Sequence, residues 1–195
     1  MDVRFAKSGD REAIESVVAS AFGGSHGRDV VEMVRGLDRS GVTRASLVAA
    51  EGEVVGHVQL SRGWIDTREE LVEIVVLSPL SVAPSQQRQG IGTQLVNAAL
   101  TEAALLGFPA VFLEGNWNYY GSRGFTNASE RGFIRPSVRI PLRAFQVALL
   151  PGYENWMVGQ LVYPEAFWVA DAVGVRDPRL RAVEERSGDS RSRSS

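Results

Sequence analysis

Residues 80–93 join an apolar segment to a glycine-containing loop and then to a helical pattern. The stretch reads Leu-Ser-Val-Ala-Pro-Ser-Gln-Gln-Arg-Gln-Gly-Ile-Gly-Thr. A strand that passes through such a loop into a helix directs several backbone N–H groups at one point, where the positive end of the helix dipole favours an anion. This stretch therefore indicates a site for a phosphate-bearing ligand.

Two common phosphate-binding motifs do not match this stretch. A Walker loop ends in Gly-Lys-Ser/Thr, but Lys7 is the only lysine of the chain. A dinucleotide-binding fingerprint needs a third glycine at position 95, where the chain has leucine. Hydrolysis of a nucleoside triphosphate and binding of a dinucleotide are therefore disfavoured.

Two segments resemble the signatures of one enzyme family. The spacing Val82-x-Pro84-x-x-Gln87-x-x-Gly90-x-Gly92 resembles the acetyl-CoA loop of the GNAT superfamily of N-acetyltransferases. The downstream Tyr-Tyr-Gly-Ser-Arg-Gly-Phe at 119–125 resembles its second signature, an aromatic pair closely followed by Gly-Phe. The resemblance covers about residues 3–125, and the segments beyond it look like the end of an uncharacterised bacterial branch.

The resemblance implies that acetyl-CoA is the co-substrate and that no metal is used. Backbone N–H groups of residues 88–93 would hold the pyrophosphate of CoA, while Leu80 and Val82 would pair with its pantetheine along a splayed strand edge. Arg88 can add a charge-assisted contact. The residues expected to bind the co-substrate are Leu80, Ser81, Val82, Gln87, Arg88, Gln89, Gly90, Ile91, Gly92, Thr93 and Asn116.

Direct acyl transfer needs a proton for the departing CoA thiolate. By resemblance, Tyr120, five residues before Phe125, occupies the position whose phenol protonates or hydrogen-bonds the leaving sulfur. A phenol with a pKa of about 10 is protonated at neutral pH and can act as an acid toward a thiolate whose conjugate acid has a pKa near 8.5. Tyr119 is the neighbouring alternative and is expected in the core.

The amine must lose a proton before it attacks, which requires a base or a chain of water molecules. Glu73 is the first candidate, because it is an acidic residue within an apolar segment, where burial would raise its pKa. Glu114, at the end of the next predicted strand, and His57, in a predicted strand at 54–64, are the alternatives.

Hydrophobic periodicity predicts the elements that position these residues. Residues 71–82 are nearly continuously apolar, as in a central strand covered on both faces, and Pro79 predicts a bulge or a local separation from the neighbouring strand, because proline cannot donate to the ladder. A helix from Gly90 to about residue 106 and a strand at 110–114 follow. Strand, helix and strand in this order indicate a crossover between parallel strands.

The flanking segments supply further predicted elements. Before the crossover unit we expect a strand at 3–7, a helix after Ser8-Gly9-Asp10, a second helix from about Asp29, and a hairpin of strands at 46–50 and 54–64. Glycine-rich residues 23–27 would form a loop between the two helices and are a candidate mobile lid. After the crossover unit, 139–150 and 159–163 offer more strand material.

These elements, with the resemblance, imply an α+β fold of the α/β-type three-layer kind. We expect a GNAT-like mixed, mainly antiparallel sheet with a splayed central parallel pair and flanking helices. At 195 residues, the chain is long enough for one well-buried core, and we expect a single domain at 1–185 with a disordered tail at 186–195.

Composition limits the partners of the chain. Its net charge of −2 argues against general attraction to nucleic acid or anionic lipid. The absence of cysteine excludes disulfides and thiolate nucleophiles, and two isolated histidines argue against a zinc site. No stretch approaches the roughly 18 apolar residues of a membrane span, and the N-terminus does not resemble a signal peptide, which predicts a cytoplasmic protein.

The sequence thus predicts an acetyl-CoA-dependent N-acetyltransferase that moves an acetyl group directly to a primary amine. A non-catalytic acyl-CoA-binding regulatory module is the alternative, and a nucleotide-binding protein is a third hypothesis. The acceptor is a small-molecule or peptide amine of unspecified class, and a homodimer is possible. The four tryptophans, at positions 64, 117, 156 and 168, are candidates for the lining of an acceptor pocket.

Overall fold

One mixed β-sheet forms the centre of the molecule. The structure is a computed structural model that describes residues 1–187 of the chain. The strand order is β1-β2-β3-β4-β5-β7-β6, and β8 pairs with the far end of β3. The strands are β1 (Asp2–Phe5), β2 (Thr43–Glu51), β3 (Glu53–Thr67), β4 (Leu71–Val82), β5 (Ala110–Glu114), β6 (Thr126–Asn127), β7 (Phe145–Leu149) and β8 (Gly159–Val162).

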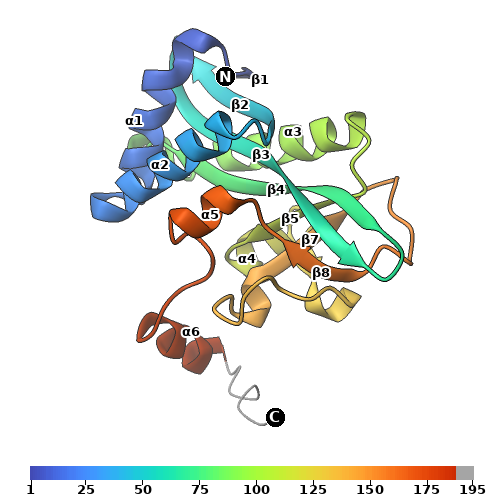
Figure 1. Cartoon of the computed structure of the whole chain (residues 1–195). Coiled ribbons are helices and arrows are strands. Elements are labelled where there is room, and N and C mark those ends of the chain that lie inside the picture. The colour runs from blue at the N-terminus through green and yellow to red at the C-terminus, as the bar shows by residue number, and fades with distance from the viewer. Residues whose placement is uncertain (188–195) are drawn as a thin grey trace.

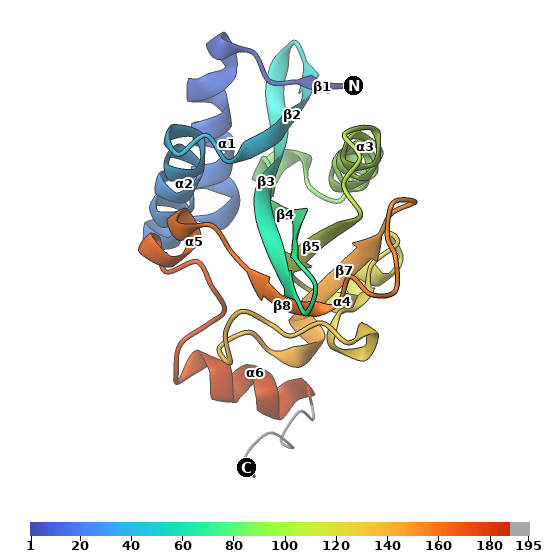
Figure 2. The same cartoon turned by 45° about the vertical axis from the view of Figure 1, so that its right-hand side comes forward.

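Helices cover both faces of this sheet. The α-helices are α1 (Arg11–Phe22), α2 (Gly24–Arg39), α3 (Ile91–Leu105), α4 (Trp117–Gly121), α5 (Glu165–Val169) and α6 (Arg179–Ser187). Helices α1 and α2 lie on one face and α3 on the other, so that the molecule has three layers (Figures 1 and 2). Each face of the sheet has its own buried apolar cluster, one under α1 and α2 and one under α3.

The central strands pair as the crossover unit predicts. Strands β4 and β5 are parallel, whereas the other strand pairs named above are antiparallel. The parallel ladder consists of Val75 opposite Val111 and Val76 opposite Phe112, and the two strands then part. The predicted α+β fold, with its splayed parallel pair and flanking helices, is confirmed.

A bulge in β4 lies where the two strands part. Val58 of β3 pairs with Leu80, but Leu60 pairs with Leu77, so that Ser78 and Pro79 together oppose a single residue of β3. This bulge confirms the prediction from Pro79. Because side chains alternate along a strand, the extra residue shifts the alternation by one.

The shift changes which residues of β4 face α3. Before the bulge, Val75 and Leu77 belong to the apolar cluster under α3, and after it Leu80 and Val82 pack against the same cluster. Ser81 therefore points to the opposite face, where it is buried. The bulge thus turns Leu80 and Val82 toward the start of α3.

The predicted lid at residues 23–27 is wrong. Helix α2 begins at Gly24, and Gly23, with φ 69°, joins it to α1. A Cβ at Gly27 would overlap the backbone oxygen of Ala19, so this glycine allows α1 and α2 to approach closely. The glycines here serve a tight helix pair and not a loop.

Two further segments differ from the sequence-based expectation. Only Phe145–Leu149 of residues 139–150 is a strand, and Leu142–Ala144 forms a 3-10 turn after Pro141, which has no N–H to give to a ladder. Arg186 and Ser187, placed in the predicted tail, end helix α6. The rest of that tail lies outside the described residues.

Candidate active site

A cavity of about 500 Å³ lies between the end of β4 and the start of α3. It is the largest of the described cavities. Its lining consists of Leu80, Val82, Gln86, Gln87, Arg88, Gly90, Gly92, Thr93, Tyr119 and Arg123. Seven of these ten residues belong to the set that the sequence predicts to bind the co-substrate. We call this space the donor cavity.

The loop that edges the donor cavity is shaped by two residues in the left-handed region. Arg88 has φ 63° and Gly90 has φ 84°, and between them they turn the chain into α3. The side-chain amide of Gln87 donates to the carbonyl of Val82 at 3.1 Å and holds the loop against the strand end. The first N–H groups of a helix have no intrahelical acceptor, so those of α3 are available to an anion in this cavity.

Part of the wall of the donor cavity is formed by Arg123, which the sequence-based prediction did not include. Arg123 donates from Nε and Nη2 to the hydroxyl of Thr93 at 3.0 and 2.8 Å, and its guanidinium lies 3.8 Å from the ring centroid of Tyr119. Arg123 follows Tyr119 by four residues, a spacing at which side chains are neighbours on a helix, so the sequence contained a signal for this contact. Tyr119, expected in the core, lines the cavity instead.

Four residues predicted to bind the co-substrate do not line the donor cavity. Ser81 points to the other face of the sheet, and the side chain of Ile91 is buried in the core under α3. Gln89 is exposed and its amide reaches back to the carbonyl of Ser85 at 3.4 Å. Asn116 caps α4 by accepting from the N–H of Asn118 at 2.9 Å. Their side chains are therefore occupied elsewhere.

A second cavity, of about 220 Å³, lies on the α1 and α2 face of the sheet. Residues from six separate parts of the chain meet there, and we call this space the acceptor-side cavity. Its lining consists of Phe22, His26, Val30, Met33, Val76, Ser78, Pro79, Glu114, Tyr163, Phe167, Asp171, Ala172, Gly174 and Val175. Of these lining residues, Glu114 is the only one that the sequence analysis predicted as a candidate for catalysis.

Glu114 stands at the end of β5, where the acceptor-side cavity meets the opening in the sheet. The N–H of Gly174 donates to its Oε2 at 2.8 Å. Burial raises the pKa of Glu114 to about 7, although the hydrogen bond from Gly174 acts in the opposite direction. Burial and the nearby Glu114 likewise raise the pKa of the fully buried Tyr163 phenol well above its usual value. A carboxyl group with a pKa near 7 has the titration range of a general base.

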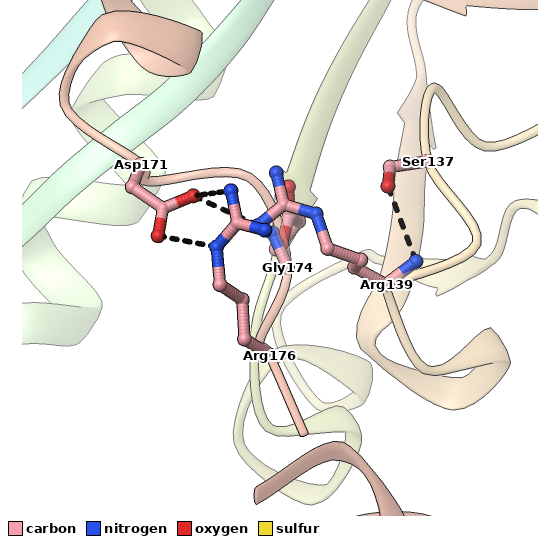
Figure 3. Close-up of polar contacts among 6 residues, drawn as sticks. Ser137, Arg139, Asp171, Gly174 and Arg176 are labelled. Carbon is pink, nitrogen blue, oxygen red and sulfur yellow. Dashed lines mark hydrogen bonds and ion pairs between the residues drawn. The ribbon is translucent and has the colours of Figure 1, made fainter. Parts of the chain in front are cut away.

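A segment near the C-terminus, residues 170–176, closes one side of the acceptor-side cavity, and we call it the strap. Arg139 donates to the carboxylate of Asp171 at 2.9 Å, and Arg176 donates to both oxygens of the same carboxylate at 2.7 and 2.8 Å (Figure 3). The N–H of Val175 also donates to the carbonyl of Arg139 at 3.0 Å. These contacts hold the N–H of Gly174 on Glu114.

The two cavities meet the same opening in the sheet from opposite faces. The end of β4 contributes Leu80 and Val82 to the donor cavity, and Ser78 and Pro79 to the acceptor-side cavity. This division follows from the bulge, which reverses the alternation of side chains between these pairs. Two molecules bound on the two faces could therefore touch through the gap between β4 and β5.

Tyr120 packs beside this gap. A Cβ at Gly115, the residue after Glu114, would overlap the ring of Tyr120, so the ring lies directly against the end of β5. It also makes edge contacts with Tyr119 and Phe125, at centroid distances of 4.9 and 5.6 Å. Burial raises the pKa of the Tyr120 phenol, which therefore stays protonated at neutral pH.

The structure does not provide the burial that made Glu73 the first candidate for a base. Its side chain is 35% exposed and forms an ion pair with Arg44, with 3.1 Å between Nε and Oε1. Glu73 precedes the parallel ladder at Val75 and Val76, whereas the gap opens after it, and Val82 lies nine positions beyond Glu73, about 30 Å at 3.3 Å per residue. Glu73 thus lies toward the opposite end of the strand from the loop.

His57 lies on β3 opposite Ser81 of β4, but it lines neither the donor cavity nor the acceptor-side cavity. It is fully buried under α1 and α2, its Nε2 lies 3.0 Å from the hydroxyl of Ser46, and burial lowers its pKa to about 4. Its own small cavity, of about 160 Å³, shares no lining residue with the donor or acceptor-side cavities. Of the proposed bases in the sequence, only Glu114 lies at the opening.

The sequence of this chain matches a known protein family. The model of the Acetyltransferase (GNAT) family matches residues 12–125, which is more than half of the chain. The chain belongs to this family. The GNAT match includes the donor loop, the end of β5 and both tyrosines, and it ends at Phe125.

Curated relatives agree with the GNAT assignment. The chain is 32% identical over 129 residues to the uncharacterized N-acetyltransferase YjhQ of Escherichia coli, covering 65% of this chain and 71% of that protein. It is 32% identical over 139 residues to the uncharacterized N-acetyltransferase YhbS of the same species, covering 70% and 81%. The predicted enzyme class, an N-acetyltransferase, is confirmed.

Solved GNAT structures share the fold across most of the chain. YhbS from Escherichia coli in complex with CoA has a TM-score of 0.75 and 25% identity, and covers 85% of this chain and 91% of that one. A GNAT acetyltransferase from Brucella melitensis in complex with acetyl-CoA has a TM-score of 0.69 and 26% identity, covering 85% and 97%. The predicted GNAT-like fold is therefore confirmed beyond the segment that the family model matches.

None of the helices in residues 1–187 of the GNAT chain is both long and apolar enough to cross a membrane. The described residues also hold no group of three or more His, Cys, Asp or Glu side chains placed to bind a metal ion.

Proposed function

We propose that this GNAT protein transfers an acetyl group directly from acetyl-CoA to a primary amine while both are bound. The observation that carries the proposal is the pair of cavities that reach one opening between β4 and β5 from opposite faces. A donor thioester placed in that gap would meet the amine without a covalent enzyme intermediate, and the chain has no cysteine to form a thioester of its own.

The donor cavity has groups suited to each part of CoA. The N–H groups at the start of α3 and the charge of Arg88 suit the pyrophosphate, and the parted edge of β4 near Leu80 and Val82 offers backbone groups to the pantetheine amides. The guanidinium of Arg123 adds a second positive charge to the wall. The solved relatives that hold CoA and acetyl-CoA support this placement.

Glu114 and Tyr120 take the two proton-transfer roles in this proposal. Glu114, ionised, accepts a proton from the acceptor ammonium, and the neutral amine then forms the new N–C bond as the C–S bond breaks. Tyr120 donates a hydrogen bond to the departing sulfur. Because burial raises the phenol pKa, Tyr120 serves as a hydrogen-bond donor, and the CoA thiolate takes the second proton that the nitrogen loses as the amide forms.

A thermal-shift titration and a thiol-release assay test the function together. Acetyl-CoA at about 100 times its Kd should stabilise the fold by roughly 2.7 kcal/mol, whereas ATP and NAD should not. Release of free CoA can be followed with a thiol reagent, because the protein contributes no cysteine. Stabilisation by acetyl-CoA without thiol release across a broad amine panel would favour a non-catalytic acyl-CoA-binding module, and stabilisation by ATP or NAD alone would favour a nucleotide-binding protein.

The substitution Gly92→Ala tests the position of the donor. A Cβ at Gly92 would overlap the hydroxyl of Tyr119 and fill part of the donor cavity. Overpacking costs about 1–3 kcal/mol, so the KM for acetyl-CoA should rise about tenfold or more. Gly9→Ala is the matched control, because Gly9 has open space around its Cβ position. An unchanged KM for Gly92→Ala would move the donor elsewhere.

A further inference from the structure

The acceptor-side cavity has a mostly apolar lining with few charged groups. Aromatic and aliphatic side chains dominate, and the acidic members of the lining are Glu114 and Asp171. Among the residues that the structure describes, no lysine or arginine belongs to this lining. His26 lies at an exposed position with its ring edge-on to Phe22, 5.5 Å between centroids.

Only one of the two carboxylates is free to meet a ligand cation. Asp171 is held by Arg139 and Arg176 through three hydrogen bonds of 2.7 to 2.9 Å. Glu114 makes no ion pair among the described residues. Its Oε2 accepts from the N–H of Gly174 at 2.8 Å, and the Tyr163 phenol and the charge of Arg139 act on its carboxyl group from nearby. The cavity therefore offers a single negative charge, next to the opening in the sheet.

The walls of the cavity limit the size of its occupant. A volume of about 220 Å³ is below the range of roughly 300–1,000 Å³ found for drug-sized ligands. The walls are also firmly supported. Met33 and Phe167 are 2% exposed, and the arginine contacts of Asp171 hold the strap. The acceptor must therefore be compact.

We propose that the acceptor is a compact monoamine with an apolar or aromatic body and no second charge. This inference rests on the proposed function, because it takes the acceptor-side cavity as the place where the amine is acetylated. The ammonium group lies at Glu114, and the apolar body contacts Met33 and Phe167. Simple phenylalkylamines and branched alkylamines have this chemistry.

The same lining disfavours other amine classes. An amino acid would bring its α-carboxylate into a cavity without a lysine or arginine, and a buried unpaired charge is costly. A polyamine would bring a second ammonium, which would find Asp171 already paired with two arginines. An aminoglycoside would exceed the volume and bring hydroxyl groups that apolar side chains cannot satisfy.

Matched amine pairs test this inference by thiol release from acetyl-CoA. The pairs are 2-phenylethylamine with phenylalanine, 3-methylbutylamine with leucine, and butylamine with 1,4-diaminobutane. In each pair, the second member has one more charged group than the first. We expect kcat/KM for the first member of each pair to exceed that of the second by at least about 100-fold, because the second member buries a charged group that has no partner in the cavity. Equal or faster transfer to phenylalanine, leucine or 1,4-diaminobutane would overturn the inference.

A variant and the donor assay separate this inference from the proposed function. Val175 is half-buried on the strap and lines the cavity, so Val175→Arg adds the missing cation. It should lower the preference for 2-phenylethylamine over phenylalanine at least tenfold while the thermal shift with acetyl-CoA persists, and an unchanged preference would count against the cavity. Failure of the wild type to bind acetyl-CoA or to acetylate any amine would overturn the proposed function itself. Transfer that prefers charged acceptors would overturn only the acceptor class.

Discussion

Replacing Glu114 with glutamine should lower kcat by about 10²–10⁴-fold, the usual contribution of a general base. Glutamine keeps the shape of the side chain and can still accept the hydrogen bond from Gly174, but it cannot take a proton from the ammonium group. The thermal shift with acetyl-CoA should remain, because Glu114 lines the other cavity. Steady-state kinetics with a saturating amine measure the effect.

The wild-type rate should decrease at low pH if Glu114 is the base. The base acts when ionised, and its pKa is raised to about 7. The wild-type kcat/KM, which reports the pKa values of the free enzyme, should therefore fall about tenfold per pH unit below pH 7 and level off above it. In Glu114→Gln this limb should disappear. A variant that keeps both the rate and the limb would assign the proton transfer to another group.

Glu73→Gln is the matched control for this experiment. It makes the same chemical change at an acidic residue whose partner is Arg44 and which lies toward the other end of β4 from the loop. Its kcat should stay within about twofold of the wild type, because loss of an exposed ion pair costs no more than about 1 kcal/mol of stability. A large loss of kcat in Glu73→Gln with no loss in Glu114→Gln would restore the sequence-based choice.

Stability measurements show whether the Glu114→Gln variant is folded. A carboxyl group whose pKa is raised in the folded state favours folding below its unfolded pKa of about 4.5, and this contribution is lost as pH rises through about 7. Glutamine does not ionise, so the variant does not lose this contribution to stability as pH rises. Glu114→Gln should therefore have a Tm above that of the wild type at pH 8 and a similar Tm at pH 4.5, while its activity at pH 8 is lower.

Replacing Tyr120 with phenylalanine should lower kcat by about 10²-fold or more and leave the affinity for acetyl-CoA nearly unchanged. The ring packs against Gly115 and Phe125, and phenylalanine preserves these contacts. What is lost is the hydrogen bond to the departing sulfur, which forms only as the C–S bond breaks and so acts on kcat. An unchanged rate would remove Tyr120 from the reaction.

Tyr119→Phe is the control for Tyr120→Phe, since the two residues are adjacent and lose the same hydroxyl group. The Tyr119 hydroxyl lies against Gly92 in the wall of the donor cavity, beside the start of α3. Its loss should raise the KM for acetyl-CoA and leave kcat within a few-fold of the wild type. The opposite result, with kcat lost in Tyr119→Phe alone, would exchange the roles of the two tyrosines.

The donor loop could be read from the sequence because its parts are neighbours in the chain. Gly90, Gly92 and the helix after them act through backbone conformation and N–H groups, which local spacing specifies. The crossover from β4 to β5 follows in the same way from the order of apolar segments, and Pro79 marks the bulge. Seven of the predicted donor residues accordingly line the donor cavity.

The position of the proposed general base and the shape of the acceptor-side cavity depended on contacts between distant segments. Glu73 stands in an apolar stretch, yet Arg44, 29 residues earlier, meets its carboxylate at a partly exposed position. Glu114 is next to the opening because β5 ends there, and Gly174, 60 residues later, donates to it. Burial of a charged group depends on which distant segment covers it, and hydrophobic periodicity reports only that a strand is apolar.

The sequence alone therefore determined the fold, the donor loop and the enzyme family, because each depends on residues that are close along the chain. The tertiary structure placed Glu114, and not Glu73, at the opening in the sheet, and it placed Arg123 and Tyr119 on the donor cavity. It lined the acceptor-side cavity with Phe22, Tyr163 and Phe167 and with none of the four tryptophans. These outcomes follow from long-range packing: a pKa and a cavity wall are set by the atoms that surround a group, whatever their separation in sequence.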